Sequence, residues 1–373
     1  MKIPLCKTNL DKKDISVIVK SLNSGWLTHG SKNIEFEKNF NNLFGTKYSV
    51  SMNSCTSALE CSIKSQNIKG EIIVPSWTWV STINAVLNCG CKPVFGDVDI
   101  NSRNITAKFI EERITKKTKA VIIVHYAGLP CKMDDIVKVC KKYKIKLIED
   151  SAETLGAKFK NKYTGTFGVG CFSFFPTKNI TTAEGGMLTT NDKRVYLHTK
   201  KLIAHGILKK NKSFPWKREA ELPGHNFRLP NHLAALGNNQ LNKLKKFNFK
   251  RNLIAKKYDN FFKSYPKIFK VQEVNKDFTH SYQMYTVQII DKNRNNFIKY
   301  LRKNNIEASV HFDPPLHRQR YCAQFKKHHL PNTDILSRTI VTMPMFPSLT
   351  NNQLGYIFKI IRKWILEVNG INL

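Results

Sequence analysis

Short β-like runs alternate with helical stretches between residues 48 and 149, and this alternation constrains the fold more than any other feature of the sequence. Apolar runs such as Ile72–Val74 and Ala120–Val124 are separated by stretches with helical spacing, for example Asp134–Tyr143. Strands that alternate with helices form a parallel sheet that is covered on both faces. The sequence therefore predicts an α/β fold. Further strands are predicted at Tyr48–Met52, Pro93–Phe95 and Lys146–Glu149, and further helices from Thr56 and near Ser81–Leu87.

The pattern changes after residue 165, and 373 residues are enough for two domains. Glycines between 165 and 186 interrupt short apolar runs. They predict strands that cross a site, because glycine lets a backbone approach a ligand closely. A helical pattern covers about 231–263, and strand-like and helical runs follow it to the end of the sequence. We expect a large α/β domain over 1–240 and a smaller α+β domain over 241–373. The smaller domain is predicted to hold strand-like runs at Tyr282–Ile290 and Ala308–Phe312, and helices over Arg294–Asn304 and Asn352–Val368.

The chain is strongly basic, because 61 lysines and arginines against 27 aspartates and glutamates give a formal net charge of +34. Such a charge allows a nucleic-acid partner. Only 12 of the basic residues are arginines, however, and the lysines are scattered rather than massed in one arm. Arginine is the usual residue for bidentate phosphate and base contacts. The pattern therefore favours a solvated basic surface, which would still attract an anionic substrate.

The number of cysteines and the hydropathy of the chain indicate the cellular compartment in which the protein works. Nine cysteines are an odd number, and no stretch approaches the ~18 apolar residues of a membrane span. The N-terminus has no signal-peptide core. We expect a cytoplasmic protein without a disulfide framework. Cys89 and Cys91 lack the second pair that a zinc site needs, so no metal site is predicted.

Two segments could bind a charged ligand. Asn53–Leu59 places small hydroxyl residues at a helix start, where N–H groups bind anions, although such residues also serve as plain N-caps. Lys146–Asp150 is a buried strand that ends in two carboxylates. Ligands of α/β sheets bind at the carboxyl ends of strands, but capping of the next turn would explain these carboxylates equally well.

A lysine and a pair of tryptophans complete the set. Lys178 follows the apolar run Phe172–Phe175. Desolvation would free its amine for a Schiff base, whereas a surface lysine often extends over apolar residues in the same way. Trp77 and Trp79 follow a strand and supply either a stacking face or core packing. Together, an anion-binding helix start, an aromatic face, an aspartate and a desolvated lysine are the parts that hold pyridoxal phosphate.

Over nearly its whole length the chain resembles the DegT-type sugar aminotransferases, which are pyridoxal-phosphate enzymes of fold type I that act on nucleotide-linked keto sugars. The resemblance implies a mainly parallel seven-stranded sheet, a pyridoxal 5'-phosphate cofactor and a homodimer with shared active sites. The motifs that carry it are Ser24–Thr28, Asn53–Leu59, Val74–Val80, Pro93–Asp99, His125–Gly128, Glu149–Ala152, Phe172–Gly186, Gly224–Arg228, Ala234–Gly237 and Pro344–Pro347.

The resemblance also implies roles for single residues. Lys178 would form the Schiff base and move the proton, and Asp150 would pair with the pyridine nitrogen. The other implied cofactor contacts are Trp79 on the ring, Thr56, Ser57 and Ser173 at the phosphate, and Asn226 at the phosphate of the neighbouring subunit's cofactor.

Two positions depart from the family pattern. Cys55 stands where a small residue usually precedes Thr56, and Glu153 stands where Gln or His usually lies near the cofactor's phenolic oxygen. A carboxylate repels a phenolate unless one of the two is protonated, so the Glu153 contact departs from the expected chemistry. Some members have His in place of the lysine and dehydrate sugars, and Lys178 disfavours that activity.

The predicted reaction is transfer of an amino group, with glutamate as donor, to C4 of a UDP-linked 4-keto sugar for a surface polysaccharide or glycan. The segments His125–Gly128, Leu330–Thr333 and Pro344–Pro347 resemble those of enzymes that aminate C4 of a UDP-linked 4-keto sugar, and this resemblance implies the substrate. The runner-up is GDP-4-keto-6-deoxymannose, as in perosamine-type enzymes, and a C3 keto sugar comes third.

The segment with His317, Arg318 and Arg320 borders the sugar-nucleotide site in relatives, and its charge suits a diphosphate. An exposed basic turn would look the same. A different class of protein, a nucleic-acid-binding or regulatory protein on an inactive aminotransferase scaffold, is the alternative. The retained Lys178, Asp150 and Ser173 disfavour it.

Overall fold

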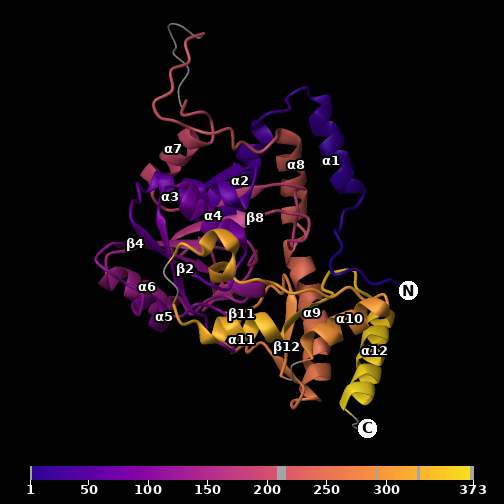
Figure 1. Cartoon of the computed structure of the whole chain (residues 1–373). Coiled ribbons are helices and arrows are strands. Elements are labelled where there is room, and N and C mark those ends of the chain that lie inside the picture. The colour runs from indigo at the N-terminus through magenta and orange to yellow at the C-terminus, as the bar shows by residue number, and fades with distance from the viewer. Residues whose placement is uncertain (1, 208–215, 291–292, 326–327, 370–373) are drawn as a thin grey trace.

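A seven-stranded sheet forms the centre of the molecule (Figure 1). The computed structural model describes residues 2–207, 216–290, 293–325 and 328–369. Neighbouring strands of the sheet run parallel except at β9, which is antiparallel to both of its neighbours. The predicted mainly parallel, seven-stranded sheet is confirmed. Its strands, in order across the sheet, are β1 (Tyr48–Met52), β9 (Gly186–Thr190), β8 (Val169–Ser173), β5 (Lys146–Asp150), β4 (Thr118–Val124), β2 (Glu71–Pro75) and β3 (Lys92–Gly96).

Helices cover both faces of this sheet (Figure 1). On β2, Ile72 and Val74 belong to one buried apolar cluster and Ile73 belongs to another, because successive side chains of a strand point to opposite faces. A strand that is buried on both sides has a continuous apolar sequence, as parallel sheets require. The helices in this part of the chain are α1 (Lys12–Asn23), α2 (Ser31–Phe44), α3 (Cys55–Ser65), α4 (Val80–Asn88), α5 (Ala107–Glu111), α6 (Met133–Lys142), α7 (Lys193–Leu202) and α8 (Asn231–Leu241).

The C-terminal part of the chain has its own apolar core around a three-stranded sheet. Ile3 from the N-terminal segment lies in the same core. A second small sheet joins β11 (Phe278–Thr279) to the hairpin of β6 (Lys158–Phe159) and β7 (Lys162–Tyr163). The domain boundary near residue 240 stays a prediction. The remaining elements are α9 (Leu244–Lys263), β10 (Phe269–Val271), β12 (Tyr285–Ile289), α10 (Arg294–Lys303), α11 (Pro331–Thr339), β13 (Ile340–Met343) and α12 (Asn351–Asn369).

The prediction of one continuous helix over 231–263 is wrong. α8 ends at Leu241 and α9 begins at Leu244. At this break Lys243 donates to the buried carboxylate of Asp14 at 2.7 Å, and Asn239 donates to the same carboxylate at 2.6 Å. The buried acid collects donors from the end of α8, and such tertiary contacts override helical periodicity.

The strand-like run predicted at Ala308–Phe312 is not a strand of any of the three sheets. Only Ser309 makes an isolated bridge, to Thr342. The carbonyl oxygen of His311 accepts a hydrogen bond from the Tyr126 hydroxyl at 2.6 Å, and Pro314 and Pro315 follow, which lack the N–H donors of a ladder. The segment therefore turns from the small sheet toward the large one.

The nine cysteines all lie in described segments as free thiols. Among the described helices, none is long and apolar enough to cross a membrane. Within the same ranges, His, Cys, Asp and Glu side chains form no group of three that could hold a metal ion.

Candidate active site

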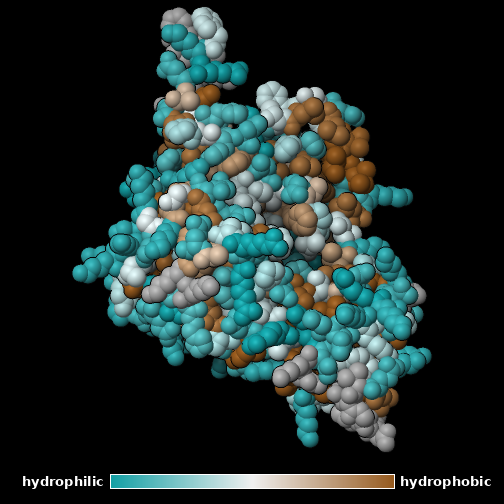
Figure 2. Space-filling model, in the orientation of Figure 1, coloured by the Kyte–Doolittle hydropathy of each residue, from teal (hydrophilic) through white to brown (hydrophobic). Residues whose placement is uncertain are grey.

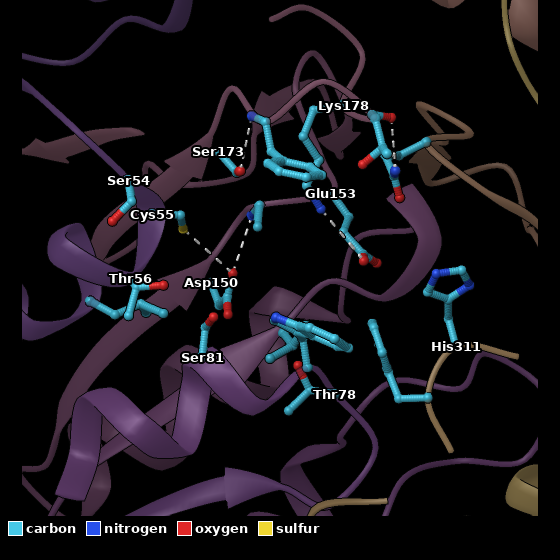
Figure 3. Close-up of a pocket in the computed structure, with 18 of the residues that line it drawn as sticks. Ser54, Cys55, Thr56, Thr78, Ser81, Asp150, Glu153, Ser173, Lys178 and His311 are labelled. Carbon is cyan, nitrogen blue, oxygen red and sulfur yellow. Dashed lines mark hydrogen bonds and ion pairs between the residues drawn. The ribbon is translucent and has the colours of Figure 1, made fainter. Parts of the chain in front are cut away.

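A cavity of about 400 Å³ opens at the carboxyl ends of three neighbouring strands (Figure 3). Its wall includes Val124, Asp150 and Ser173, the last residues of β4, β5 and β8. Ligands of open α/β sheets bind in the crevice outside these strand ends, so the sheet topology places the cavity. Of the residues singled out from the sequence, the cavity brings together Thr56, Trp79, Asp150, Glu153, Ser173 and Lys178.

Hydroxyl groups and the start of α3 form one end of the cavity (Figure 3). Ser54 is the N-cap of α3, and its Oγ accepts a hydrogen bond from the backbone N–H of Ser57 at 3.1 Å. Thr56 and Ser173 line the same end. A Cβ at Gly186 would collide with the backbone of Ser54, so glycine is needed where β9 passes this turn. A helix start flanked by hydroxyl groups suits an anion such as phosphate.

The Asp150 carboxylate is buried beside the cavity and has few partners. The Thr82 hydroxyl donates to its Oδ2 at 2.8 Å, and the backbone N–H of Ala152 donates to Oδ1 at 3.2 Å. The Cys55 thiol lies 4.0 Å from Oδ1. Burial raises the pKa of Asp150, against the lowering effects of these two hydrogen bonds and of the Lys178 charge. A buried carboxylate of this kind is suited to pair with a protonated group of a ligand.

Glu149, the neighbour of Asp150, has a structural environment instead. Its carboxylate accepts backbone N–H groups from the turn 165–168 at 2.7 to 2.8 Å. It also lies 3.2 Å from Nε2 of His125. Nδ1 of His125 accepts the backbone N–H of Cys131 at 2.9 Å, so Nε2 carries the proton that points at Glu149. Of the two carboxylates that end β5, Glu149 therefore anchors the glycine-rich turn and Asp150 faces the ligand cavity.

Replacing Glu149 with glutamine is expected to lower the free energy of unfolding by about 3 kcal/mol. In one orientation the new amide N–H groups would face the N–H donors of Phe167 and Gly168, and in the other they would face those of Gly165 and His125. Urea unfolding measures the loss, with Glu35→Gln as control because the Glu35 side chain is 47% exposed and should cost under about 0.5 kcal/mol. Equal unfolding free energies for the two variants would contradict the anchoring role.

Lys178 enters the cavity from the loop after β8, with 16% of its side chain exposed. Its Nζ lies 3.9 Å from Oε1 of Glu153, and Oε2 of Glu153 accepts the backbone N–H of Ala127 at 2.7 Å. Burial raises the pKa of Glu153, and the charge of Asp150 raises it further. The charge of Lys178 and the hydrogen bond from the Ala127 N–H lower it in part. Figure 3 shows Lys178 and Glu153 at the end of the cavity away from the start of α3.

The two tryptophans have different environments. Trp79 lines the cavity and is 58% exposed. Its ring lies 5.9 Å from that of Phe312. Trp77 is buried in the core, with its ring 6.2 Å from that of Tyr126. The stacking face that the sequence allows is therefore available at Trp79, whereas Trp77 packs in the core.

Two residues with implied cofactor contacts do not line the cavity. The Ser57 hydroxyl donates to Oδ1 of Asn53 at 2.7 Å and helps to hold the turn before α3. Asn226 is exposed on a separate segment, where Arg228 donates to its Oδ1 at 3.1 Å. Ser57 thus acts on the shape of the site, and Asn226 lies outside the cavity of its own chain.

The basic segment after residue 316 also lies outside the cavity wall. His317 Nε2 and Arg318 both contact Oδ1 of Asp334, at 3.4 and 2.6 Å. Burial lowers the pKa of His317, although Asp334 opposes this effect. Arg320 is exposed. Asp334 therefore already pairs with His317 and Arg318. The positive charges that the segment exposes are those of Arg318 and Arg320.

Several residues of the cavity wall cannot be singled out from the sequence, among them the polar residues His311 and Gln283. Nδ1 of His311 lies 2.9 Å from the Thr342 hydroxyl. Burial, assisted by the Lys178 charge, lowers the pKa of His311 to about 4, so its imidazole is neutral at pH 7. Both residues come from the C-terminal part of the chain, about 100 residues or more after Lys178. No local motif links them to the lysine, and a contact of this kind is visible only in the fold.

Comparison with known proteins gives one consistent result. A sequence model described as the DegT/DnrJ/EryC1/StrS aminotransferase family matches residues 8–362. The spore coat polysaccharide biosynthesis protein SpsC of Bacillus subtilis is 33% identical over 375 residues, which cover 96% of both chains. The UDP-4-amino-4-deoxy-L-arabinose–oxoglutarate aminotransferase of Shewanella sediminis is 32% identical over 364 residues, which cover 93% of this chain and 94% of the relative.

The fold gives the same result. The structure of Helicobacter pylori PseC, an aminotransferase involved in the biosynthesis of pseudoaminic acid, superposes with a TM-score of 0.92 and 30% identity. The match covers 97% of this chain and 99% of PseC. The α/β architecture with its mainly parallel sheet is thus that of the fold type I aminotransferases.

Members of the matched family depend on pyridoxal 5'-phosphate, and solved relatives include pyridoxal-phosphate and pyridoxamine-phosphate forms. The cavity fits this group. A helix start with hydroxyls suits the phosphate, Asp150 is a buried carboxylate for a ring nitrogen, Trp79 offers an uncovered flat face, and the Lys178 amine points into the same space.

Proposed function

Because this chain belongs to the DegT/DnrJ/EryC1/StrS family of pyridoxal-phosphate-dependent aminotransferases, we propose that it transfers an amino group from glutamate to C4 of a UDP-linked 4-keto sugar. The observation that carries the proposal is the single cavity that holds the Lys178 amine, the buried Asp150 carboxylate and the start of α3. The Shewanella relative, whose name includes a UDP-linked 4-amino sugar and oxoglutarate, supports the substrate and the donor.

Bound pyridoxal phosphate supplies an electron-withdrawing ring that stabilises negative charge on the carbon that loses its proton. In the proposed mechanism Lys178 would hold the cofactor covalently. Its Nζ, once free, would be the group that takes the proton from the donor's α-carbon. The same amine moves the proton in the opposite sense when the sugar is aminated. Its position inside the cavity, 16% exposed, limits proton exchange with water.

Asp150 is proposed to keep the ring nitrogen protonated, and Trp79 is proposed to pack on the ring face. The Thr82 hydroxyl and the Ala152 N–H fix the direction of the Asp150 carboxylate. Because the carboxylate is buried with few donors, a protonated ring nitrogen gives it the partner that it lacks.

The phosphate is proposed to bind at the start of α3. Thr56 and Ser173 line that end of the cavity and supply hydroxyl donors. Ser57 supports the site through its hydrogen bonds with Ser54 and Asn53. The helix dipole favours the negative charge of the phosphate at this end.

We further propose a homodimer in which Asn226 contacts the phosphate in the neighbouring subunit. The residue is exposed and lies outside the cavity of its own chain. An apolar surface supports association with a second copy. Figure 2 shows hydrophobic residues gathered over α1 and the segment near it. Exposed apolar side chains that gather in one contiguous patch are typical of a protein interface, whereas scattered ones are not. The exposed apolar side chains there are Ile15, Val19, Leu22, Trp26 and Leu27, between 42 and 59% exposed.

Mixing two defective variants tests the shared site. Lys178→Ala and Asn226→Ala homodimers are both expected to be impaired. In the mixed dimer, one site combines the intact lysine of one chain with the intact asparagine of the other. Random exchange of subunits should therefore restore about one quarter of wild-type amino transfer. Unchanged activity after exchange, verified by native mass spectrometry of the mixed dimer, would place Asn226 outside the partner's site.

Assay of a substrate panel tests the function itself. Purified protein with pyridoxal phosphate and glutamate is offered UDP-linked 4-keto sugars, GDP-4-keto-6-deoxymannose, C3 keto sugars and free keto acids. We expect the UDP-linked 4-keto sugars to have the highest kcat/KM. A preference for another member of the panel would replace the proposed substrate. A colourless protein that transfers no amino group but shifts DNA at physiological salt would support the nucleic-acid-binding alternative.

A further inference from the structure

Glu153 is buried in the cavity wall and depends on Lys178 for its charge partner. The residue is 7% exposed. Its Oε2 accepts the backbone N–H of Ala127 at 2.7 Å, whereas no described residue donates a hydrogen bond to Oε1. The cation that pairs with Oε1 is Nζ of Lys178, at 3.9 Å (Figure 3). A buried carboxylate stays ionised only while such a partner offsets the cost of its burial, so the charge of Glu153 depends on that of Lys178.

The groups around Glu153 carry more negative than positive charge. Asp150 adds a second buried carboxylate and raises the pKa of Glu153. Burial raises the pKa of the Tyr126 hydroxyl, which also interacts with Glu153, so this hydroxyl is uncharged. The ionisable side chains that line the cavity are Cys55, Asp150, Glu153, Lys178, Glu184 and His311. Lys178 is the only cation among them at pH 7, because His311 is neutral. One cation therefore serves two buried carboxylates.

Attachment of pyridoxal phosphate changes the partner of the Lys178 nitrogen. Nζ forms a bond to the aldehyde carbon, and the aldehyde oxygen leaves as water. The positive charge stays on the nitrogen, so this step exchanges no proton with solvent. The cofactor carries a phenolate oxygen on the ring carbon next to its aldehyde group, and this oxygen becomes the closest negative group to that nitrogen. Glu153 then lacks the charge that stabilised its ionised form.

We propose that Glu153 takes up one proton from solvent when Lys178 binds pyridoxal phosphate. This inference rests on the proposed attachment of the cofactor to Lys178. Oε2 continues to accept the Ala127 N–H, so the proton binds to Oε1, the oxygen without a hydrogen-bond donor. A neutral acid repels neither the phenolate nor Asp150. The site therefore binds its cofactor together with a proton.

Proton uptake gives cofactor binding a pH dependence of defined sign. Below the pKa of Glu153 in the empty cavity, the acid is already protonated and binding takes up no proton. Between that pKa and the higher one in the loaded cavity, the Kd of the cofactor rises about tenfold per pH unit. Burial raises the pKa of Glu153 above its ordinary value even in the empty cavity, so this window opens above about pH 4.5.

Titration calorimetry of the cofactor into cofactor-free protein at pH 7 tests this uptake. Runs in two buffers that differ in ionisation enthalpy and contain no primary amine give the number of protons bound per cofactor. The cofactor stays below one equivalent, and the visible absorbance band confirms its attachment. We expect wild type to take up about one proton more than Glu153→Gln. Glutamine still accepts the Ala127 N–H but takes up no proton.

Infrared difference spectra give a second measurement, which for wild type needs no variant. Loading of wild type should produce the C=O stretch of a protonated carboxylic acid, and Glu153→Gln should lack this band. Glu37→Gln is the matched control, because Glu37 is also 7% exposed and lies 3.6 Å from Nζ of Lys200 but outside the cavity. It should keep both wild-type signals. Equal proton uptake by wild type and Glu153→Gln, or an infrared band that persists in Glu153→Gln, overturns the inference.

The outcomes also separate this inference from the proposed function. Wild type that forms no visible band with the cofactor overturns the attachment to Lys178 and the role of Glu153 together. Wild type that forms the band and transfers amino groups, but shows neither the extra proton nor the infrared signal, overturns the role of Glu153 alone. Wild type that shows both signals but aminates no nucleotide-linked keto sugar supports the role of Glu153 and overturns the proposed substrate.

Discussion

Replacing Lys178 with alanine is expected to lower the rate of amino transfer by about 10⁴-fold or more, because one amine both attaches the cofactor and moves the proton. The visible absorbance band that borohydride bleaches should disappear as well. The fold should survive, since within the described residues Nζ makes only a 3.9 Å ion pair with Glu153. Single-turnover measurements of the glutamate reaction check the rate, and the absorbance spectrum checks the attachment.

Lys200→Ala is the matched control for this variant. The Lys200 side chain is 24% exposed, and its Nζ lies 3.6 Å from the buried Glu37, so its surroundings are like those of Lys178. It lies outside the cavity. Its loss should alter stability slightly and leave the spectrum unchanged. Near-normal turnover in Lys178→Ala would remove this lysine from the mechanism and leave only the family assignment.

The sequence predicts the large sheet well because its strands are buried on both faces. Ile72–Val74 and Ala120–Val124 are short, continuous apolar runs, and such runs are typical of strands inside a covered parallel sheet. Lys178 and Asp150 could likewise be found because each lies at or just after a strand end, where the topology places ligands.

The sequence predicts the C-terminal contribution to the site poorly because that contribution depends on long-range contacts. Gln283 lines the cavity through a hydrogen bond to Thr177, 106 residues earlier in the chain. The break between α8 and α9 depends in the same way on Asp14, near the N-terminus. Periodicity and motifs describe neighbours along the chain, and neither carries information about these partners.

Replacing Asp150 with asparagine is expected to slow amino transfer by about 10²- to 10³-fold, the usual effect of removing one preorganised electrostatic group. Asparagine has nearly the same shape. Its Oδ1 can accept the Ala152 N–H, and its amide N–H can donate to the Thr82 hydroxyl oxygen in place of the bond that Thr82 now donates. It cannot keep a ring nitrogen protonated. Unchanged kcat in this variant would exclude Asp150 from the reaction.

The same variant should change stability in the opposite direction. Burial raises the pKa of Asp150 in the folded, cofactor-free protein, so its ionisation opposes folding. Below the unfolded pKa of about 4 both states are protonated and the penalty is absent, whereas it is fully present once the pH exceeds the folded pKa. Cofactor-free Asp150→Asn should therefore be more stable than wild type at pH 7, and this gain should vanish as the pH falls below about 4.

Asp97→Asn is the control that separates a functional acid from a structural one. Asp97 is also buried, but it accepts the backbone N–H groups of Val98, Asn332 and Thr333 and the Thr333 hydroxyl. Its loss should destabilise the fold by about 2–3 kcal/mol at pH 7. A carboxylate with four donors stabilises the protein that it is part of. Among the described residues, Asp150 has two close donors, the Thr82 hydroxyl and the Ala152 N–H, and a weak third donor, the Cys55 thiol at 4.0 Å. The remaining capacity of its carboxylate is what a cofactor can use, so a stability loss in Asp150→Asn equal to that in Asp97→Asn would contradict this assignment.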